Sequence, residues 1–231
     1  MKPETSLIRA EQKKVTALVT KKFKQYYLTG GTALAFYFNH RISEDLDFFS
    51  QTYDRSDPDR IMDFVSGRTR RPYRFEQEQD DPKLVPMKVY TLELRKGIPL
   101  KVDFVQDFAK NRRPVKNGLH SVEDIYYRKI WAAIGGRQKV GSVGQGLPSG
   151  RQSAKDAYDL YWLSREHEAL SGFFVRNFSE AQAERLILWW KGFHRRDLKL
   201  ELTDLAPGTD PGKVPQYLDD EILKKFPGKL L

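Results

Sequence analysis

The sequence predicts an α+β fold, in which a mixed β-sheet flanked by helices is followed by a C-terminal helical bundle. Two patterns carry this prediction. Short alternating stretches typical of half-buried strands cluster between residues 45 and 106, and apolar residues at helical spacing dominate from residue 121 onward. The 231 residues are enough for two compact parts. We expect residues 1–112 to form the sheet-containing domain and residues 113–231 the helical domain.

The N-terminal third begins with a helix and a glycine turn. Residues 6–24 place apolar side chains at helical spacing, with Lys and Glu on the other face, which predicts a basic amphipathic helix. The short apolar run Tyr26–Leu28 then meets Gly30-Gly31, and Thr32–Phe38 contains no helix breaker. This order predicts a strand or extended entry, a glycine turn and a helix.

Strands and one helix follow up to residue 106. The alternation in residues 45–49 predicts a half-buried strand. Asp57 is the expected N-cap of a helix that has Pro58 at its first position and ends near Val65. Three further strands, separated by Asp-Asp-Pro and Lys-Gly turns, are expected at Tyr73–Glu78, Val85–Leu94 and Leu100–Val105.

The second half is predicted to be helical. One helix runs from Ser121 to Ile134, and capping-box pairs begin two more, Ser153 with Asp156 and Ser179 with Gln182. Residues 135–150 contain six glycines, so we expect a mobile loop there. A stretch rich in Pro and Gly, residues 207–215, precedes a short C-terminal helix.

Composition excludes several classes of protein. The chain contains no cysteine, which rules out disulfides, zinc ribbons and thiol catalysis. Its four histidines are scattered, so we expect them at the surface and expect any metal to be held by oxygen. No apolar run approaches the ~18 residues of a membrane span, and the N-terminus lacks a signal-peptide core. We expect a soluble, cytoplasmic protein without membrane contact.

The net charge of +9 is concentrated in two segments. Residues 1–30 carry seven basic and two acidic side chains, and residues 110–155 carry ten and two. Clustered basic surface attracts polyanions such as nucleic acid, although a solvated surface would look the same from the sequence.

Two short motifs indicate a phosphate site next to a metal site. In Thr29-Gly30-Gly31-Thr32, two glycines ahead of a helix allow close approach of the backbone, and the free N–H groups of the first turn attract phosphate. Asp45 and Asp47 alternate on the next strand and therefore point to the same face, where they can share a hard cation such as Mg²⁺. Together the motifs meet two requirements of phosphoryl or nucleotidyl transfer.

A third carboxylate belongs with this pair. Asp103 lies in the apolar strand Leu100–Val105, where an unpaired charge would be costly to bury. A metal ion is one candidate partner for Asp103, and an arginine or the exposed end of the strand is the alternative.

These residues resemble a known family. Leu28–Leu34 and Arg41–Phe48 are similar to the signature of AbiEii-type (MenT-like) nucleotidyltransferases, the toxins of type IV toxin–antitoxin pairs within the DNA polymerase β-like superfamily. Asp103 matches the third acid of that family, Val122–Ile125 with Lys129 resembles its lysine helix, and Lys155–Leu160 resembles its Lys-Asp-x-Tyr-Asp-Leu motif.

The resemblance implies a nucleotidyltransferase-type sheet and a Mg²⁺-dependent enzyme, with Mn²⁺ as an alternative, that transfers NMP from an NTP to an acceptor hydroxyl and releases pyrophosphate. The metal ligands would be Asp45, Asp47 and Asp103, and these with Lys129 would be the catalytic residues. The nucleotide contacts would be Gly30, Gly31, Thr32, Lys129, Lys155, Asp156 and Asp159. The basic segments favour an RNA acceptor, such as a tRNA 3′ end, with a protein hydroxyl as the alternative. A cognate antitoxin would be the protein partner.

Two other functions remain open from the sequence. An Asp-x-Asp metal site also serves sugar-nucleotide glycosyltransferases, although only 44 residues precede Asp45 and those enzymes have a larger nucleotide-binding domain there. A non-catalytic module that binds RNA or a partner is the second alternative, and the presence of all the matched acids argues against it.

Overall fold

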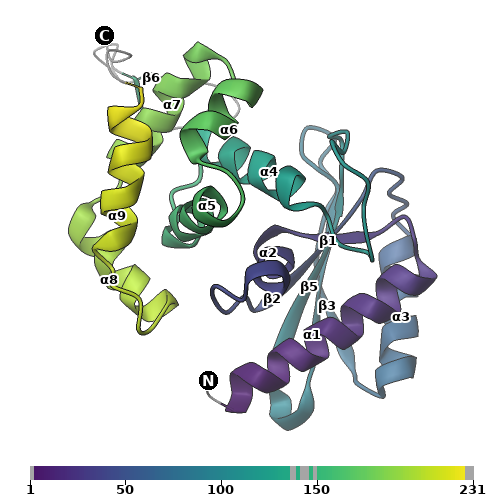
Figure 1. The fold of residues 1–231 in the computed structure, drawn as a ribbon. Coiled ribbons are helices and arrows are strands. Elements are labelled where there is room, and N and C mark those ends of the chain that lie inside the picture. The colour runs from purple at the N-terminus through teal and green to yellow at the C-terminus, as the bar shows by residue number, and fades with distance from the viewer. Residues whose placement is uncertain (1–2, 136–138, 141–145, 148–149, 227–231) are drawn as a thin grey trace. The chain divides into compact units, whose positions relative to one another are not determined.

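The computed structural model describes residues 3–135, 139–140, 146–147 and 150–226, and the chain forms two compact units, Met1–Ser121 and Val122–Leu231 (Figure 1). The α+β prediction is confirmed. The division falls after Ser121 rather than after residue 112, because residues 116–120 remain attached to the first unit. There the Leu28 amide donates to the Gly118 carbonyl and the His120 amide donates to the Leu28 carbonyl, both at 2.9 Å.

The first unit is a five-stranded mixed sheet with three helices. The strands follow the order β1-β2-β5-β4-β3, in which only the β2–β5 pair is parallel. The strands are β1 (Tyr27–Thr29), β2 (Asp45–Ser50), β3 (Tyr73–Gln79), β4 (Met87–Glu93) and β5 (Pro99–Gln106). The helices are α1 (Pro3–Lys22), α2 (Gly30–Phe38) and α3 (Asp57–Thr69), and a 3₁₀ turn spans Arg95–Gly97.

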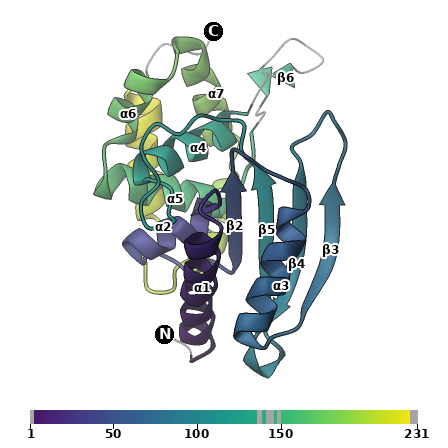
Figure 2. The same cartoon turned by 90° about the vertical axis from the view of Figure 1, so that its right-hand side faces the viewer.

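One face of this sheet forms the core, and α1 and α3 lie over it (Figure 2). Alternate residues of β2 are fully buried, and the ring of Phe48 stacks on Phe104 of β5 with centroids 5.5 Å apart. Lys88 Nζ and the Tyr90 hydroxyl of β4 both contact the Asp59 carboxylate of α3 at 2.6 Å. Because side chains alternate along a strand, the acids of β2 and β5 project from the opposite face.

The second unit is helical. Its helices are α4 (Val122–Ile134), α5 (Ala154–Glu166), α6 (Leu170–Asn177), α7 (Glu180–Lys191), α8 (Arg195–Leu205) and α9 (Lys213–Leu218), followed by a π-helical turn, Asp219–Lys224. Trp189 and Trp190 are fully buried in its core. The capping box of Ser179 and Gln182 is confirmed at the start of α7. None of the helices in the described ranges is both long and apolar enough to cross a membrane.

Several local predictions differ from the structure. The helix expected from Thr32 begins at Gly30, since glycine is tolerated in a first turn whose N–H groups have no intrahelical partner. Asp57 is not the N-cap: Ser56 occupies that position, and Asp57 is the first helical residue, paired with Arg60 at 3.1 Å.

The glycine-rich segment, residues 135–150, lies largely outside the described residues. Two short described stretches of it, β6 (Lys139–Val140) and β7 (Gly146–Leu147), pair as an antiparallel ladder.

The surface prediction for the histidines is wrong for two of them. His40 and His120 are buried. His120 Nδ1 lies 3.0 Å from Thr29 Oγ1, its Nε2 lies 3.1 Å from Asn111 Oδ1, and its ring packs against Tyr27. A scattered histidine is thus used here to fix the segment that lies beside β1.

Candidate active site

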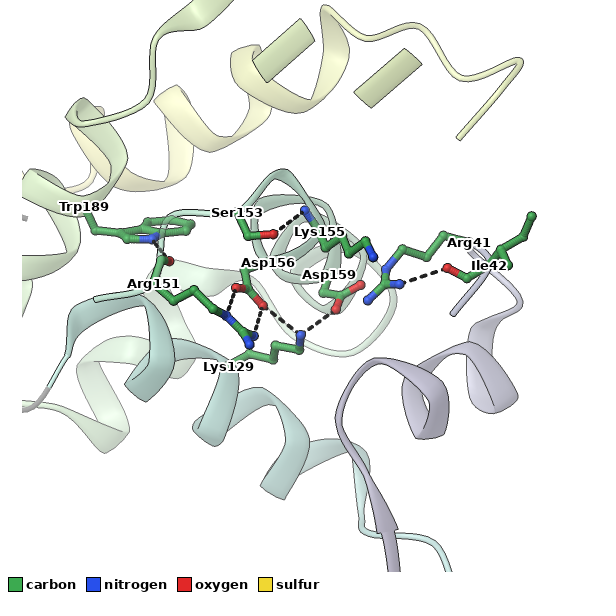
Figure 3. A network of polar contacts seen from close by, with 9 residues as sticks. All are labelled: Arg41, Ile42, Lys129, Arg151, Ser153, Lys155, Asp156, Asp159 and Trp189. Carbon is green, nitrogen blue, oxygen red and sulfur yellow. Dashed lines mark hydrogen bonds and ion pairs between the residues drawn. The ribbon is translucent and has the colours of Figure 1, made fainter. Parts of the chain in front are cut away.

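The two glycines bring backbone against functional side chains. Gly30 has φ +69°, and a Cβ there would lie 2.9 Å from Asp47 Oδ2. A Cβ on Gly31 would lie 2.4 Å from Arg41 Nη2, and Arg41 Nη1 donates to the Ile42 carbonyl at 2.9 Å (Figure 3). Only glycine combines the left-handed backbone with this close approach. The first turn of α2 therefore packs directly on the Asp47 carboxylate.

Thr32 connects the helix to the loop before β2. Its side chain is buried, and its hydroxyl makes hydrogen bonds with Ser43 Oγ at 2.8 Å and with the Asp45 carbonyl oxygen. The hydroxyl therefore holds the loop that leads to Asp45. The group of Thr32 that could bind a phosphate is its backbone N–H.

Three carboxylates share one face of the sheet. Asp45 and Asp47 lie at alternate positions of β2, and Asp103 lies on the adjacent parallel strand β5, where it is the register partner of Asp47. Side chains opposite each other in paired strands are close neighbours on the same face. The structure thus brings together acids that lie 56 positions apart in the sequence (103 − 47).

Asp103 is the most buried carboxylate of the three. Its Oδ2 accepts a hydrogen bond from Lys101 Nζ at 2.6 Å, whereas its buried Oδ1 has no hydrogen-bond partner among the described residues. Burial raises the pKa of Asp103 above its usual range, Lys101 opposes this shift, and the charge of Asp45 adds to it.

The donor set fits a hard divalent cation. Three carboxylates on one face, one with an orphaned oxygen, offer the all-oxygen environment that Mg²⁺ and Mn²⁺ prefer. In their present rotamers the carboxylates do not converge: within the described ranges, no group of three or more acidic or histidine side chains is arranged to hold a metal ion. Lys101 supplies a positive charge to Asp103 instead.

Lys101 is the site residue that the sequence reasoning missed. It pairs in register with Asp45 and lies two residues before Asp103, so all three side chains share one face. Burial would lower the pKa of Lys101, but its hydrogen bond with Asp103 and the charges of Asp45 and Asp47 raise it above its ordinary value. The Lys-x-Asp spacing could have identified Lys101 from the sequence, because residues two apart on a strand point to the same face of the sheet.

A pocket of about 590 Å³ adjoins this face. It extends from Asp45 and Lys101 across β4 and β3, and its charged lining consists of Glu44, Asp45, Glu76 and Lys101. Arg74 neutralises Glu76 through a 2.8 Å ion pair. The lining is therefore acidic near Asp45.

The second unit contains the other predicted residues, and three of them, Lys129, Asp156 and Asp159, join in a buried ion cluster (Figure 3). Lys129 Nζ of α4 lies 2.8 Å from Asp156 Oδ1 and 2.7 Å from Asp159 Oδ2, both on α5. Arg151 donates two hydrogen bonds to the Asp156 carboxylate, from Nε at 2.6 Å and from Nη2 at 2.7 Å. Two cations face two carboxylates, so this cluster is neutral.

The cluster shifts the pKa of its members. Burial alone would raise the pKa of Asp156, but Lys129 and Arg151 together hold it below its usual value. Burial alone would lower the pKa of Lys129, but Asp159 and Asp156 raise it. Both directions favour the ionised forms, and the pairs join α4 to α5.

The expected capping box at α5 is only half formed. The Ser153 hydroxyl accepts from the Lys155 amide at 3.3 Å, whereas the Asp156 carboxylate is occupied by Lys129 and Arg151. Lys155 itself is exposed at the start of the helix. The predicted site residues therefore fall into two groups, each assembled within its own unit.

Comparison with known proteins decides the family. Residues 16–206 match the family model described as "Nucleotidyl transferase AbiEii toxin, Type IV TA system". The chain belongs to the AbiEii family. It is accordingly a nucleotidyltransferase of a toxin family, and the resemblance first seen in the glycine and aspartate motifs is confirmed.

The structure is similar to solved structures, and one of them shares its fold. A protein from H. pylori assigned as a nucleotidyltransferase has a TM-score of 0.59 at 16% identity, covering 98% of this chain and 96% of that one. The nucleotidyltransferase toxin MenT4 of Mycobacterium tuberculosis has a TM-score of 0.49 at 13% identity, covering 96% of this chain and 82% of that one. No curated protein matches the sequence.

Proposed function

We propose that this AbiEii protein transfers a nucleoside monophosphate from an NTP to a hydroxyl of RNA, with Mg²⁺ or Mn²⁺ as cofactor. The observation that carries the proposal is the register pairing of Asp47 with Asp103 beneath the backbone of Gly30. A phosphate cradle and a carboxylate cluster share one surface, as phosphoryl chemistry requires. With these substrates the protein would act in the cytoplasm.

The residues of the first unit have distinct roles in this proposal. The backbone N–H groups of Gly30, Gly31 and Thr32 hold the terminal phosphates of the NTP. Asp45, Asp47 and Asp103 hold the metal, which when bound neutralises phosphate charge and orients the α-phosphate.

The reaction forms a bond between the acceptor oxygen and the α-phosphorus and breaks the bond between that phosphorus and the departing pyrophosphate oxygen. The acceptor hydroxyl loses its proton to the Asp103 carboxylate. Pyrophosphate carries the electron pair of the broken bond.

The second unit contributes the remaining predicted contacts. Lys155 is exposed and contacts the nucleotide phosphates in this proposal. Lys129 already has two carboxylate partners, so its role includes holding Asp156 and Asp159 in place as well as stabilising the leaving group. The ion cluster would then orient α5, the helix that presents Lys155.

The test is label transfer from α-³²P-labelled NTPs to total RNA in the presence of Mg²⁺. We expect Asp45→Ala/Asp47→Ala to reduce transfer by at least about 100-fold, the scale of losing key charge stabilisation at a transition state. Asp80→Ala/Asp81→Ala, which removes two exposed carboxylates between β3 and β4, is the matched control. Transfer that survives in the first variant would rule out the metal-acid assignment.

The acidic pocket also admits a second candidate acceptor, a protein hydroxyl. Glu44 and Asp45 would repel a chain of phosphates, so the pocket suits an uncharged end, either a terminal nucleoside or a protein hydroxyl. Adding cell protein in place of RNA to the same labelling reaction separates the two. Label that resists ribonuclease and is released by protease would establish a protein acceptor.

A further inference from the structure

A groove beside α8 of the second unit has the opposite charge from the pocket near Asp45. Its volume is about 490 Å³. It is lined by Arg195, Arg196, Lys199, Leu200, Thr203 and Pro211. Three of these six residues are cations and none is an acid, so the groove suits an anionic ligand.

The sequence of α8 sorts its charges onto separate faces. Leu198 and Leu202 are buried and anchor the helix. On a wheel of about 100° per residue, the groove residues of α8 span roughly 0–140° and its acids roughly 180–240°. Those acids are Asp197, Glu201 and Asp204. The basic face is therefore separated from the acids of the same helix.

Arg195 is fixed in place and still has donor capacity. Its Nη2 contacts Asp219 Oδ1 at 2.7 Å, and its Cζ lies 4.1 Å from the centroid of the Trp190 ring, whose Nε1 donates to the same carboxylate oxygen at 2.7 Å. Its buried Nη1 has no hydrogen-bond partner in the described part of the chain. A guanidinium held rigidly with an unused donor is suited to accept an anion.

The other two cations are unpaired. Arg196 and Lys199 are exposed, and neither side chain has an ion-pair partner among the described residues. Leu200 lies beside them with 60% of its surface exposed. The groove thus combines positive charge, which attracts phosphates, with an apolar side chain that a ribose or base can contact.

We propose that this groove binds the backbone of single-stranded RNA and so holds the acceptor. The choice of RNA among polyanions rests on the proposed function. That function needs a second binding surface for the RNA. The acid-lined pocket near Asp45 admits the uncharged end of the RNA but disfavours the phosphates of the adjoining nucleotides. Arg196 and Lys199 contact phosphates, and Leu200 contacts a ribose or base.

The test is the fluorescence anisotropy of a fluorescein-labelled single-stranded RNA, titrated with the full-length protein at several KCl concentrations without NTP or metal. We expect Arg196→Gln/Lys199→Gln to weaken binding on the order of tenfold at low salt and to lower the slope of log K against log[KCl] by roughly 1.4, or about 0.7 per lost phosphate contact. Lys224→Gln/Lys225→Gln makes the same charge change at the last residue of the π-helical turn and the residue after it, and should alter neither quantity. Equal melting temperatures would show that both variants fold.

Each outcome decides the proposal. Unchanged affinity and slope in Arg196→Gln/Lys199→Gln would overturn it, and so would poly-glutamate of equal charge competing as well as RNA, because the groove would then suit an acidic protein. Because binding needs no catalysis, RNA binding that depends on the groove but is not accompanied by label transfer would reject RNA as the acceptor. It would still support the groove as an RNA-binding site. Label transfer to RNA with an unchanged KM for RNA in this variant would reject the groove alone.

Discussion

At the scale of single residues, the site depends on one glycine and one lysine. Gly30 adopts a left-handed backbone against the Asp47 carboxylate, and Lys101 supplies the positive charge that Asp103 receives in this structure. Gly30 acts on an acid of another segment, β2, whereas Lys101 acts on an acid of its own strand, two residues away. Both roles follow from side-chain and backbone contacts at the acid face.

Gly30→Ala should impair the site more than the fold. A non-glycine residue at φ +69° costs roughly 1–2 kcal/mol, and the added Cβ would displace Asp47 Oδ2, which lies 2.9 Å from its position. We expect at least about a tenfold loss of label transfer, since small misplacements at a reacting centre are costly. Gly67→Ala is the control: it meets no atom within 4 Å on α3 and should stabilise the protein by about 0.5–1 kcal/mol. Equal activity of the two variants would contradict the role of Gly30.

Lys101→Met should tighten metal binding. The Lys101 ammonium competes with a metal for Asp103, and removing roughly 1 kcal/mol of such attraction strengthens Mn²⁺ binding by about fivefold. Isothermal titration calorimetry with Mn²⁺ alone measures this without turnover. Lys83→Met, in the exposed turn between β3 and β4, makes the same charge change and should leave Mn²⁺ affinity unaltered. Weaker Mn²⁺ binding in Lys101→Met would show that the lysine supports the site instead.

At the scale of elements, the buried ion cluster is the contact that fixes α5 against α4. Lys129 forms ion pairs with both Asp156 and Asp159, and all three side chains are almost fully buried. Buried pairs cost desolvation, but breaking one leaves a charge without a partner. The cluster is therefore sensitive to the loss of any one member.

Lys129→Met should destabilise the second unit by about 3–5 kcal/mol, the usual cost of breaking a buried ion pair by removing one member. Lys155→Met, which removes the exposed lysine of the same motif, should change stability by less than about 0.5 kcal/mol. Urea denaturation followed by tryptophan fluorescence measures both. Stability equal to that of the wild type in Lys129→Met would show that the cluster does not hold the helices together.

The lowered pKa of Asp156 predicts acid sensitivity of the same contact. A carboxyl whose pKa is lower in the folded state contributes stability above its unfolded pKa of about 3.9, and this contribution is lost as the pH falls through the folded value. We expect the free energy of unfolding to decrease as the pH falls below the unfolded pKa of about 3.9, because the unfolded chain then binds a proton that the folded carboxylate still resists. Asp156→Asn should be less stable at neutral pH and show a flatter decrease. An identical pH slope in both proteins would contradict this assignment.

At the scale of the whole molecule, the AbiEii chain forms two compact units. The first contains the Gly30 turn and the three acids, and the second contains the ion cluster, Lys155 and the basic groove of α8. Membership of a toxin family implies an antitoxin partner for this enzyme. It also sets aside the glycosyltransferase and the non-catalytic module that the sequence left open.

Expression in a bacterial host should arrest growth if this chain is an active toxin. The arrest should be relieved by Asp45→Ala/Asp47→Ala, which removes the proposed metal ligands, and should persist in Asp80→Ala/Asp81→Ala. Colony counts after induction, with immunoblots for equal expression, measure the effect. Arrest by the first variant at equal protein levels would mean that toxicity does not depend on this site.

Local sequence patterns were enough to predict most of the secondary structure and the chemical types of the site. Alternation predicted the four longer strands to within a few residues, and the Gly-Gly and Asp-x-Asp motifs identified the acid-bearing region, because these patterns need only neighbouring residues. The family followed from the same motifs.

The contacts between distant residues could be seen only once the chain was folded. The parallel pairing of β2 with β5 put Asp47 beside Asp103 and Lys101 beside Asp45, the packing of α4 on α5 gave Lys129 its two carboxylates, and the segment beside β1 buried His120. Burial, partners and pKa depend on residues that are distant in sequence, and no local periodicity encodes the register that brings them together.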